Sequence, residues 1–137
     1  MEDETSFAKQ LEDLYKYMKP IKISFNSVGS FFESGALYLS PVMTTELYEL
    51  HCKHHQVLQG YGNSSSPFYL PGQWVPHCTI ANRLSSRELA EAYSYCINRI
   101  HPLSGEITKI ALIKVQGSAA PVIHSTSLKE ADNCSIM

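Results

Sequence analysis

Residues 73–84, QWVPHCTIANRL, place a histidine and a hydroxyl two positions apart, directly after a proline. On a β-strand, His77 and Thr79 would point to the same face. Histidine titrates near neutral pH and exchanges protons, and a hydroxyl can donate a hydrogen bond to a phosphate oxygen. The spacing therefore indicates one of two things: an acid–base and phosphate-binding pair on an open strand face, or a structural histidine near a strand end.

Composition limits the classes of protein to which the chain can belong. Of its 137 residues, 44% are hydrophobic and 18% are charged, which is typical of a globular domain. The formal net charge of −2 gives no general attraction to nucleic acid, so any contact with RNA must be local. No apolar run approaches the length of a membrane span, and the N-terminus, MEDETSFAKQ, lacks the pattern of a secretory signal. We therefore expect a cytoplasmic protein without membrane association, with one domain over residues 1–128 and a flexible tail over 129–137.

Three minor patterns have simpler explanations. His51 and His55 lie four residues apart in HCKHH, a spacing that can hold zinc, but no third ligand is placed by the sequence. We favour a solvated helix face and predict no metal or other cofactor. The terminal CSIM fits a prenylation box, but the residues before it are not polybasic, so we expect no lipidation. The cysteines form no CxxC pair and are expected to be reduced thiols: Cys52, Cys78, Cys96 and Cys134.

Hydrophobic periodicity predicts an α+β fold with an antiparallel sheet and helices packed on the outside. Strands and helices alternate without the regular βαβ order of a parallel sheet. The predicted elements are a helix over 7–18, strands over 21–28 and 36–39, a helix over 44–58, a strand through His77 and Thr79, a helix from a capping box at Ser85 and Glu88 to Ile100, and strands over 106–115 and 120–128.

The segment VPHCTIANRL resembles the second His-x-Thr motif of the two-histidine phosphoesterases, also called the 2′-5′ RNA ligase-like family. Neighbouring segments resemble the family's other pieces in the same order. ISFNSVGSFFESGALYLSP is similar to the strand pair before the motif, and ELYELHCKHH to the intervening helix. SSRELAEAYSYC is similar to the helix after the motif, and ITKIALIKV to the closing strand. The resemblance covers about residues 19 to 115.

The resemblance implies most of a two-lobed fold in which two His-x-Thr or His-x-Ser motifs face each other across a groove. One histidine acts as base and the other as acid, the hydroxyls hold a phosphate, and a 2′,3′-cyclic phosphate or a 2′-5′ linkage is opened or closed without metal. It implies that His77 is one acid–base group and Thr79 one phosphate ligand, with a nucleotide or RNA terminus carrying a cyclic phosphate as the partner. Trp74 and Tyr69, just upstream, either stack on a base or anchor the loop.

The sequence departs from the family at its N-terminus. The first motif should precede the segment that begins at Phe7, but residues 1–20 contain no histidine, so we expect this motif to be missing. Three interpretations stay open: an active cyclic phosphodiesterase or ligase-like enzyme, a non-catalytic module that binds nucleotides or RNA ends, and an inactive remnant. An incomplete lobe would leave unpaired strand edges, which leads us to expect self-association. A second formal His-x-Thr, His124 to Thr126, lies where the family places no catalytic group, and we expect it to be incidental.

Overall fold

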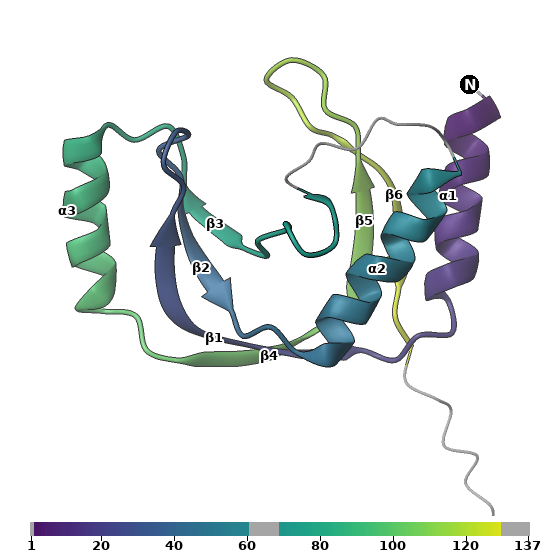
Figure 1. Cartoon of the computed structure of the whole chain (residues 1–137), viewed down its shortest axis with the longest axis horizontal. Helices are drawn as coiled ribbons and strands as arrows, with labels where there is room; N and C mark the ends of the chain where they lie inside the picture. The colour runs from purple at the N-terminus through teal and green to yellow at the C-terminus, as the bar shows by residue number, and fades with distance from the viewer. Residues whose placement is uncertain (1, 61–68, 130–137) are drawn as a thin grey trace, which may run out of the picture.

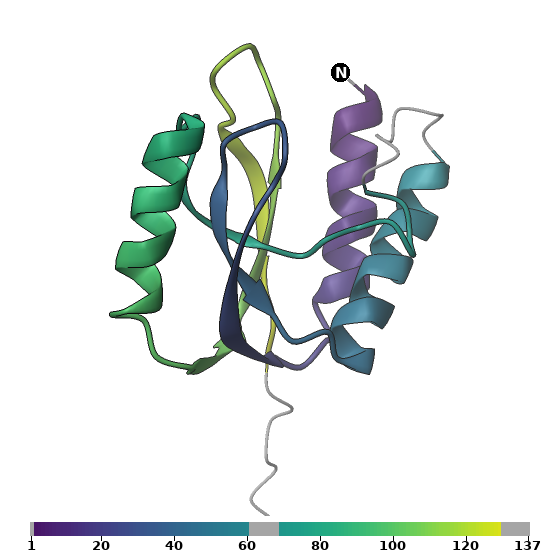
Figure 2. The same ribbon diagram turned by 60° about the vertical axis from the view of Figure 1, so that its left-hand side comes forward.

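The computed structural model describes residues 2–60 and 69–129 (Figure 1). One antiparallel sheet has the strand order β3-β2-β1-β4, and β5 and β6 form a separate antiparallel pair. Helix α3 covers one arm of the molecule, and α1 and α2 lie together beyond the other, so the predicted α+β class with helices on the outside is confirmed (Figures 1 and 2). The elements are α1 (Glu2–Tyr15), β1 (Ile21–Ser30), β2 (Leu37–Pro41), α2 (Thr45–Gln59), β3 (Cys78–Ala81), α3 (Ser86–Ile97), β4 (Leu103–Ile107), β5 (Lys109–Ile113) and β6 (Val122–Ser127).

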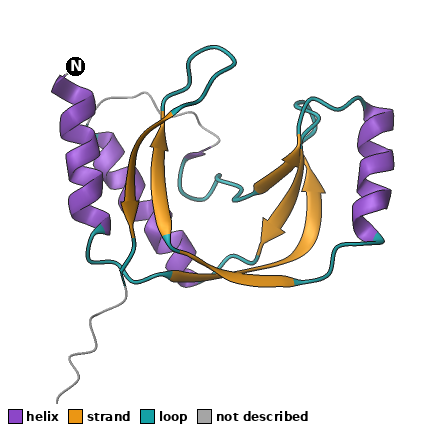
Figure 3. Ribbon diagram, turned by 180° about the vertical axis from the view of Figure 1, so that it is seen from behind, coloured by secondary structure: helices purple, strands orange, loops and turns teal. Residues whose placement is uncertain are grey.

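Strand β1 connects the two arms because it is long and bends in its middle. Its first half, Ile21–Phe25, pairs with β4, and the part from Ser27 onward pairs with β2. The register shifts between Phe25 and Ser27, and such a bulge bends a strand and increases its twist. Figure 3 shows β1 and β4 crossing the base of the molecule before β1 rises into the arm that carries β2 and β3. The bend therefore sets this arm opposite the β5–β6 hairpin.

Each arm of the molecule has an apolar centre of its own. Between α1, α2 and the hairpin, the buried side chains of Leu11, Tyr15 and Leu128 form a core that is surrounded by half-buried hydrophobic residues. In the other arm, Leu37 is only 1% exposed, and Cys96 of α3 is also buried. Burial of such side chains is the main source of stability for a domain of this size. None of the helices in the described residues combines the length and the apolar character that crossing a membrane requires.

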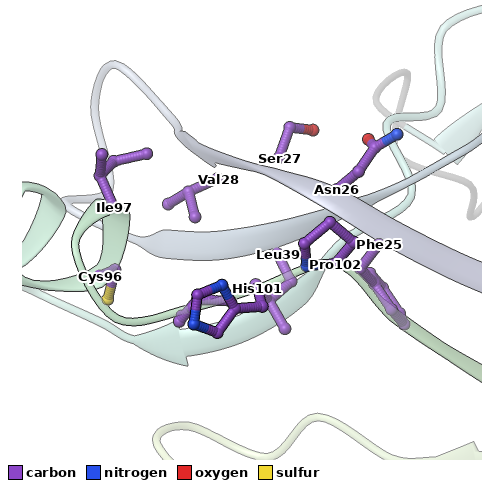
Figure 4. A pocket seen from close by; sticks show the side chains of 10 residues that line it. Phe25, Asn26, Ser27, Val28, Leu39, Cys96, Ile97, His101 and Pro102 are labelled. Atoms are coloured by element: carbon purple, nitrogen blue, oxygen red, sulfur yellow. The ribbon is translucent and has the colours of Figure 1, made fainter.

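Helix α3 covers only one face of the four-stranded sheet. A small pocket between helix and sheet brings Val28 of β1 and Leu39 of β2 together with Cys96 and Ile97 of α3 (Figure 4). Val28 and Leu39 are directly paired, so they project to the same face. Their neighbours along each strand therefore project to the opposite face, away from α3.

The segment 106–115, predicted as a single strand, is in fact two strands in different sheets. Ile107 of β4 pairs with Ile21 of β1, whereas Ile110 of β5 pairs with Thr126 of β6. Thr108 lies between them and belongs to neither strand. Both strands contribute side chains to the core around α1, but Ile107 and Ile110 are three residues apart, so the alternation changes phase at the break. The prediction of a single strand ignored this change of phase.

The predicted start of α3 is confirmed, but its predicted end is wrong. The Ser85 hydroxyl accepts from the Glu88 N–H at 3.2 Å, and the Glu88 carboxylate accepts from the Ser85 N–H at 3.0 Å, which is a complete capping box. The helix ends at Ile97 and not at Ile100. The Asn98 side chain donates to the Ser94 carbonyl at 2.7 Å, and a side chain that bonds the backbone in this way competes with helix continuation.

The smaller predictions have mixed outcomes. The predicted strand over 36–39 is shifted, since β2 runs over Leu37–Pro41, and the predicted helix over 44–58 is confirmed as α2 with Thr44 as its N-cap. Cys52, Cys78 and Cys96 are free thiols. Cys134, the CSIM end and all but the first residue of the predicted tail lie outside the described residues.

Candidate functional site

The sequence predicted that His77 and Thr79 both lie on a strand, but only one of them does. Thr79 is in β3, whereas His77 immediately precedes it. Strand β3 pairs with β2 only from Cys78, which is opposite Leu39. Pro76 has no N–H to donate, so the chain before Cys78 cannot continue the hydrogen-bond ladder in the regular way. Both His77 and Thr79 are exposed.

Thr79 lies on the face of the sheet that is turned away from α3. It pairs with Tyr38, and Tyr38 pairs with Gly29, so the three residues project to one face. Val28 and Leu39, which line the pocket beneath α3, belong to the opposite face. In Figures 1 and 2 the β5–β6 hairpin lies on the side of this sheet that α3 does not occupy. Thr79 is therefore on the sheet face toward the hairpin.

The imidazole of His77 is seated against two aromatic rings. Its centroid lies 4.8 Å from that of Phe31, with the ring planes at 87°, and 5.5 Å from that of Tyr38. The Phe31 and Tyr38 rings are themselves 4.6 Å apart. Rings at these separations attract one another beyond their burial of area. Because Tyr38 is also the strand partner of Thr79, this aromatic seat brings the His77 ring to the same part of the sheet face as Thr79.

A backbone hydrogen bond orients the His77 ring. Its Nδ1 atom lies 2.7 Å from the carbonyl oxygen of Val75. A carbonyl only accepts hydrogen bonds, so Nδ1 must carry a proton and donate it. In the neutral imidazole, Nε2 is then the nitrogen with the lone pair. His77 is therefore an exposed histidine whose Nδ1 is fixed by the backbone and whose Nε2 carries the lone pair.

Trp74 and Tyr69, predicted either to stack on a base or to anchor the loop, lie in the turn that precedes His77. The Trp74 indole stacks on the His51 ring of α2, with centroids 4.0 Å apart and planes at 13°. His51 Nε2 lies 2.6 Å from the Tyr69 carbonyl oxygen, to which it donates. The Tyr69 side chain is 53% exposed. One face of Trp74 is thus covered by the protein, as in an anchor, and stacking on a base by either side chain stays a prediction.

The second His-x-Thr faces a different part of the molecule. On β6, His124 pairs with Leu112 and Thr126 pairs with Ile110, and both β5 residues pack against the core around α1. Thr126 is 8% exposed, and His124 Nε2 lies 3.2 Å from its hydroxyl oxygen. This pair therefore lies on the helix-covered face of the hairpin, where its polar groups bond to each other.

Two histidines of α2 contact other elements: His51 contacts the turn before His77, and His54 contacts α1. His54 Nδ1 lies 2.6 Å from the hydroxyl oxygen of Tyr15 in α1. Burial lowers the pKa of His54, with a further contribution from His51 and His55, and burial raises the pKa of the Tyr15 phenol. The Tyr15–His54 hydrogen bond is therefore one between two neutral groups. Across residues 2–60 and 69–129, no cluster of three or more His, Cys, Asp or Glu side chains is suited to hold a metal ion.

The sequence alone does not assign Phe31, Tyr38 or His51 to the site. Tyr38 carried a signal, because it alternates with Leu37 and Leu39 along β2 and so had to face the side opposite to them. Phe31 and His51 carried no such signal, because each contacts a residue that is distant in the sequence and is brought near only by the tertiary fold. Phe31 and Tyr38 contact the His77 ring, and His51 contacts the turn that precedes His77.

The comparison with protein families matches most of the chain. Residues 1–119 match the family model described as the 2′-5′ RNA ligase superfamily, and this range includes His77 and Thr79. A search of curated proteins finds no match.

Proposed function

The chain belongs to the 2′-5′ RNA ligase superfamily, and on that premise we propose that it acts on a 2′,3′-cyclic phosphate or a 2′-5′ linkage at the end of a nucleotide or RNA. The observation that supports this most is the fixed orientation of an exposed His77, whose Nδ1 donates to the Val75 carbonyl. A single working nitrogen is what acid–base chemistry requires. The position of Thr79 on the same part of the sheet face supports a role in holding the phosphate.

In the proposed reaction, water attacks the phosphorus of the cyclic phosphate. A new P–O bond forms, and the bond to the 2′- or 3′-oxygen breaks. The water loses a proton and the leaving oxygen gains one. His77 performs one of these transfers at Nε2, taking the proton as a neutral imidazole or giving it as the imidazolium, and solvent performs the other. The Thr79 hydroxyl donates a hydrogen bond to a non-bridging phosphate oxygen. The proposed steps need no metal.

One imidazole serves only one of these two proton transfers at a time. General acid or base assistance typically contributes roughly 10²- to 10⁴-fold each. With His77 as the acid–base group we therefore expect weak binding of a cyclic nucleotide and slow turnover.

The test uses the full chain with 2′,3′-cyclic AMP, following hydrolysis and binding by ³¹P NMR. His77→Ala should lower turnover by roughly 10²-fold or more while cyclic AMP still binds. Thr79→Val, which keeps the shape and removes the hydroxyl, should weaken binding by roughly ten- to a hundredfold, the size of one hydrogen bond to a charged group. His124→Gln is the control and should change neither quantity.

The outcomes separate the alternatives. Binding that depends on Thr79, without turnover by any variant, would favour the non-catalytic binding module. Turnover that survives His77→Ala but is abolished by His124→Gln would move the site to the C-terminal His-x-Thr. A wild-type chain that neither binds nor hydrolyses 2′,3′-cyclic AMP contradicts the proposal for this substrate.

A further inference from the structure

The turn before His77 is a compact unit. The Leu70 carbonyl accepts hydrogen bonds from the N–H groups of both Gln73 and Trp74, each at 2.9 Å. Gly72, directly before Gln73, has φ of +86°, a backbone conformation that glycine adopts without steric cost. Because these hydrogen bonds close the turn on itself, residues 69–74 are expected to move together when they move at all.

His51 of α2 holds this unit at both of its ends. Its Nε2 donates to the carbonyl of Tyr69, where the turn begins, and its ring lies flat against the indole of Trp74, where the turn ends. The first contact is directional and the second is a broad stacking surface, so together they fix both the position and the orientation of the turn. His51 is half-buried beneath it. In the described residues, His51 is the α2 side chain that makes both contacts.

The held turn leads directly to the carbonyl that orients His77. Val75 follows Trp74 in the chain, and its carbonyl oxygen accepts from Nδ1 of His77 at 2.7 Å. We propose that His51 is a positioning residue: by clamping residues 69–74 to α2, it fixes the Val75 carbonyl and thereby determines which nitrogen of His77 carries the proton. The consequence for catalysis rests on the proposed function, whereas the effect on the imidazole does not.

The two aromatic rings beside His77 cannot select between its Nδ1–H and Nε2–H tautomers. Phe31 and Tyr38 contact the His77 ring through ring faces and edges, at centroid distances of 4.8 and 5.5 Å. Such contacts restrict the plane of the imidazole but do not distinguish Nδ1 from Nε2 strongly. A carbonyl acceptor does distinguish them, because it bonds only to the protonated nitrogen. The Val75 carbonyl is therefore the group that sets the His77 tautomer. The contacts that fix the position of this carbonyl consequently influence the tautomer as well.

The experiment reads the His77 tautomer directly, in the full chain labelled with ¹⁵N-histidine and at about pH 8, well above the ordinary histidine pKa. His51→Ala should lower the ratio of the Nδ1–H to the Nε2–H form of His77 roughly two- to tenfold, the effect of losing about one net hydrogen bond. His51→Gln keeps a donor but no ring, and His51→Phe keeps a ring but no donor. Each should give a smaller change than His51→Ala.

The matched control is His55→Ala, one turn further along the same helix, which should leave the His77 tautomer ratio unchanged. The signal of His54, which bonds to Tyr15, reports whether α1 and α2 remain packed in every variant. An unchanged His77 ratio in His51→Ala, with the His54 signal intact, would overturn the proposal. So would a Trp74→Ala variant that raises KM for 2′,3′-cyclic AMP and leaves the His77 ratio unaltered, because Trp74 would then be a ligand contact.

Turnover provides the second measurement. If His51 acts through His77, His51→Ala should lower kcat for 2′,3′-cyclic AMP about two- to tenfold and leave KM within about twofold, because Thr79 still holds the phosphate. A rise in KM with unchanged kcat would contradict the proposal. The tautomer measurement needs no substrate, so a chain without turnover would contradict the proposed function while the role of His51 is still decided.

Discussion

Replacing Gly29 by alanine tests whether Tyr38 is held in the position that supports His77. A Cβ atom at Gly29 would lie 2.7 Å from Cζ of the Tyr38 ring and 2.8 Å from its Cε2 and Oη atoms. Gly29 and Tyr38 are partners across β1 and β2, so the ring must move if the ladder is to stay intact. Overpacking of this kind typically costs about 1–3 kcal/mol. We expect Gly29→Ala to lower the free energy of unfolding by about that amount.

Gly105→Ala is the matched control for this change. Gly105 also lies in the four-stranded sheet, on β4, but a Cβ atom there would have no heavy atom within 4 Å. An alanine without a clash stabilises by about 0.4–1 kcal/mol, because the unfolded chain has fewer conformations to lose. The two variants should therefore differ by about 1–4 kcal/mol in urea denaturation, with equal m-values.

The same substitution should also reach His77. The Tyr38 ring lies 5.5 Å from the His77 ring and 4.6 Å from the Phe31 ring, so a displaced Tyr38 disrupts the aromatic seat. The ¹H signals of the His77 imidazole should shift in Gly29→Ala, since nearby aromatic rings influence them, and should not shift in Gly105→Ala. If Gly29→Ala is as stable as Gly105→Ala and the His77 signals are unmoved, the inference that Tyr38 supports His77 is wrong.

Two further predictions concern stability. Because burial lowers the pKa of His54, the unfolded state binds a proton more readily than the folded state, so stability is complete above about pH 6.5 and falls as the pH drops from there through the lower folded-state pKa. Urea denaturation across this range should show the loss, and the same slope in His54→Gln would assign it to another group. Gly35 and Gly117 have similar φ values of +64° and +61°. A Cβ atom at Gly35 would lie 2.2 Å from the Leu84 carbonyl oxygen, whereas a Cβ atom at Gly117 would have no heavy atom within 4 Å. Gly117→Ala should cost about 1–2 kcal/mol for its backbone conformation alone and Gly35→Ala clearly more in thermal denaturation, while equal costs would contradict the predicted clash.

The features that sequence predicted well are local in the chain. The capping box needs only Ser85 and Glu88, three residues apart, and both of its hydrogen bonds form. The helix predicted over 44–58 follows from helical spacing, and the structure buries its residue Leu47. Such elements could be predicted because their hydrogen bonds close within one turn of the chain. The face of the sheet to which Thr79 points could be predicted for a similar reason, because side chains alternate between the two faces along a strand.

The features that sequence did not predict depend on contacts between distant segments. His51 and Trp74 are 23 residues apart, and nothing in either segment encodes that their rings stack. The division of 106–115 at Thr108 depends on which sheet each half joins, and the change of phase between Ile107 and Ile110 does not specify that. The position of His77 before β3 depends on where the ladder with β2 begins. In each case tertiary pairing selected among arrangements that the local pattern allowed equally.

The two His-x-Thr sequences of this chain show what a motif determines and what it does not. Both place an imidazole and a hydroxyl at the same spacing, and both meet a strand of an antiparallel pair. At His124 and Thr126 the shared face packs toward α1, so the hydroxyl is buried and the two side chains bond to each other. At His77 and Thr79 both residues are exposed, and the carbonyl that bonds His77 comes from the backbone two residues away. The arrangement at His77 and Thr79 leaves an imidazole nitrogen and a hydroxyl accessible to a phosphate, and for that reason we propose the chemistry there.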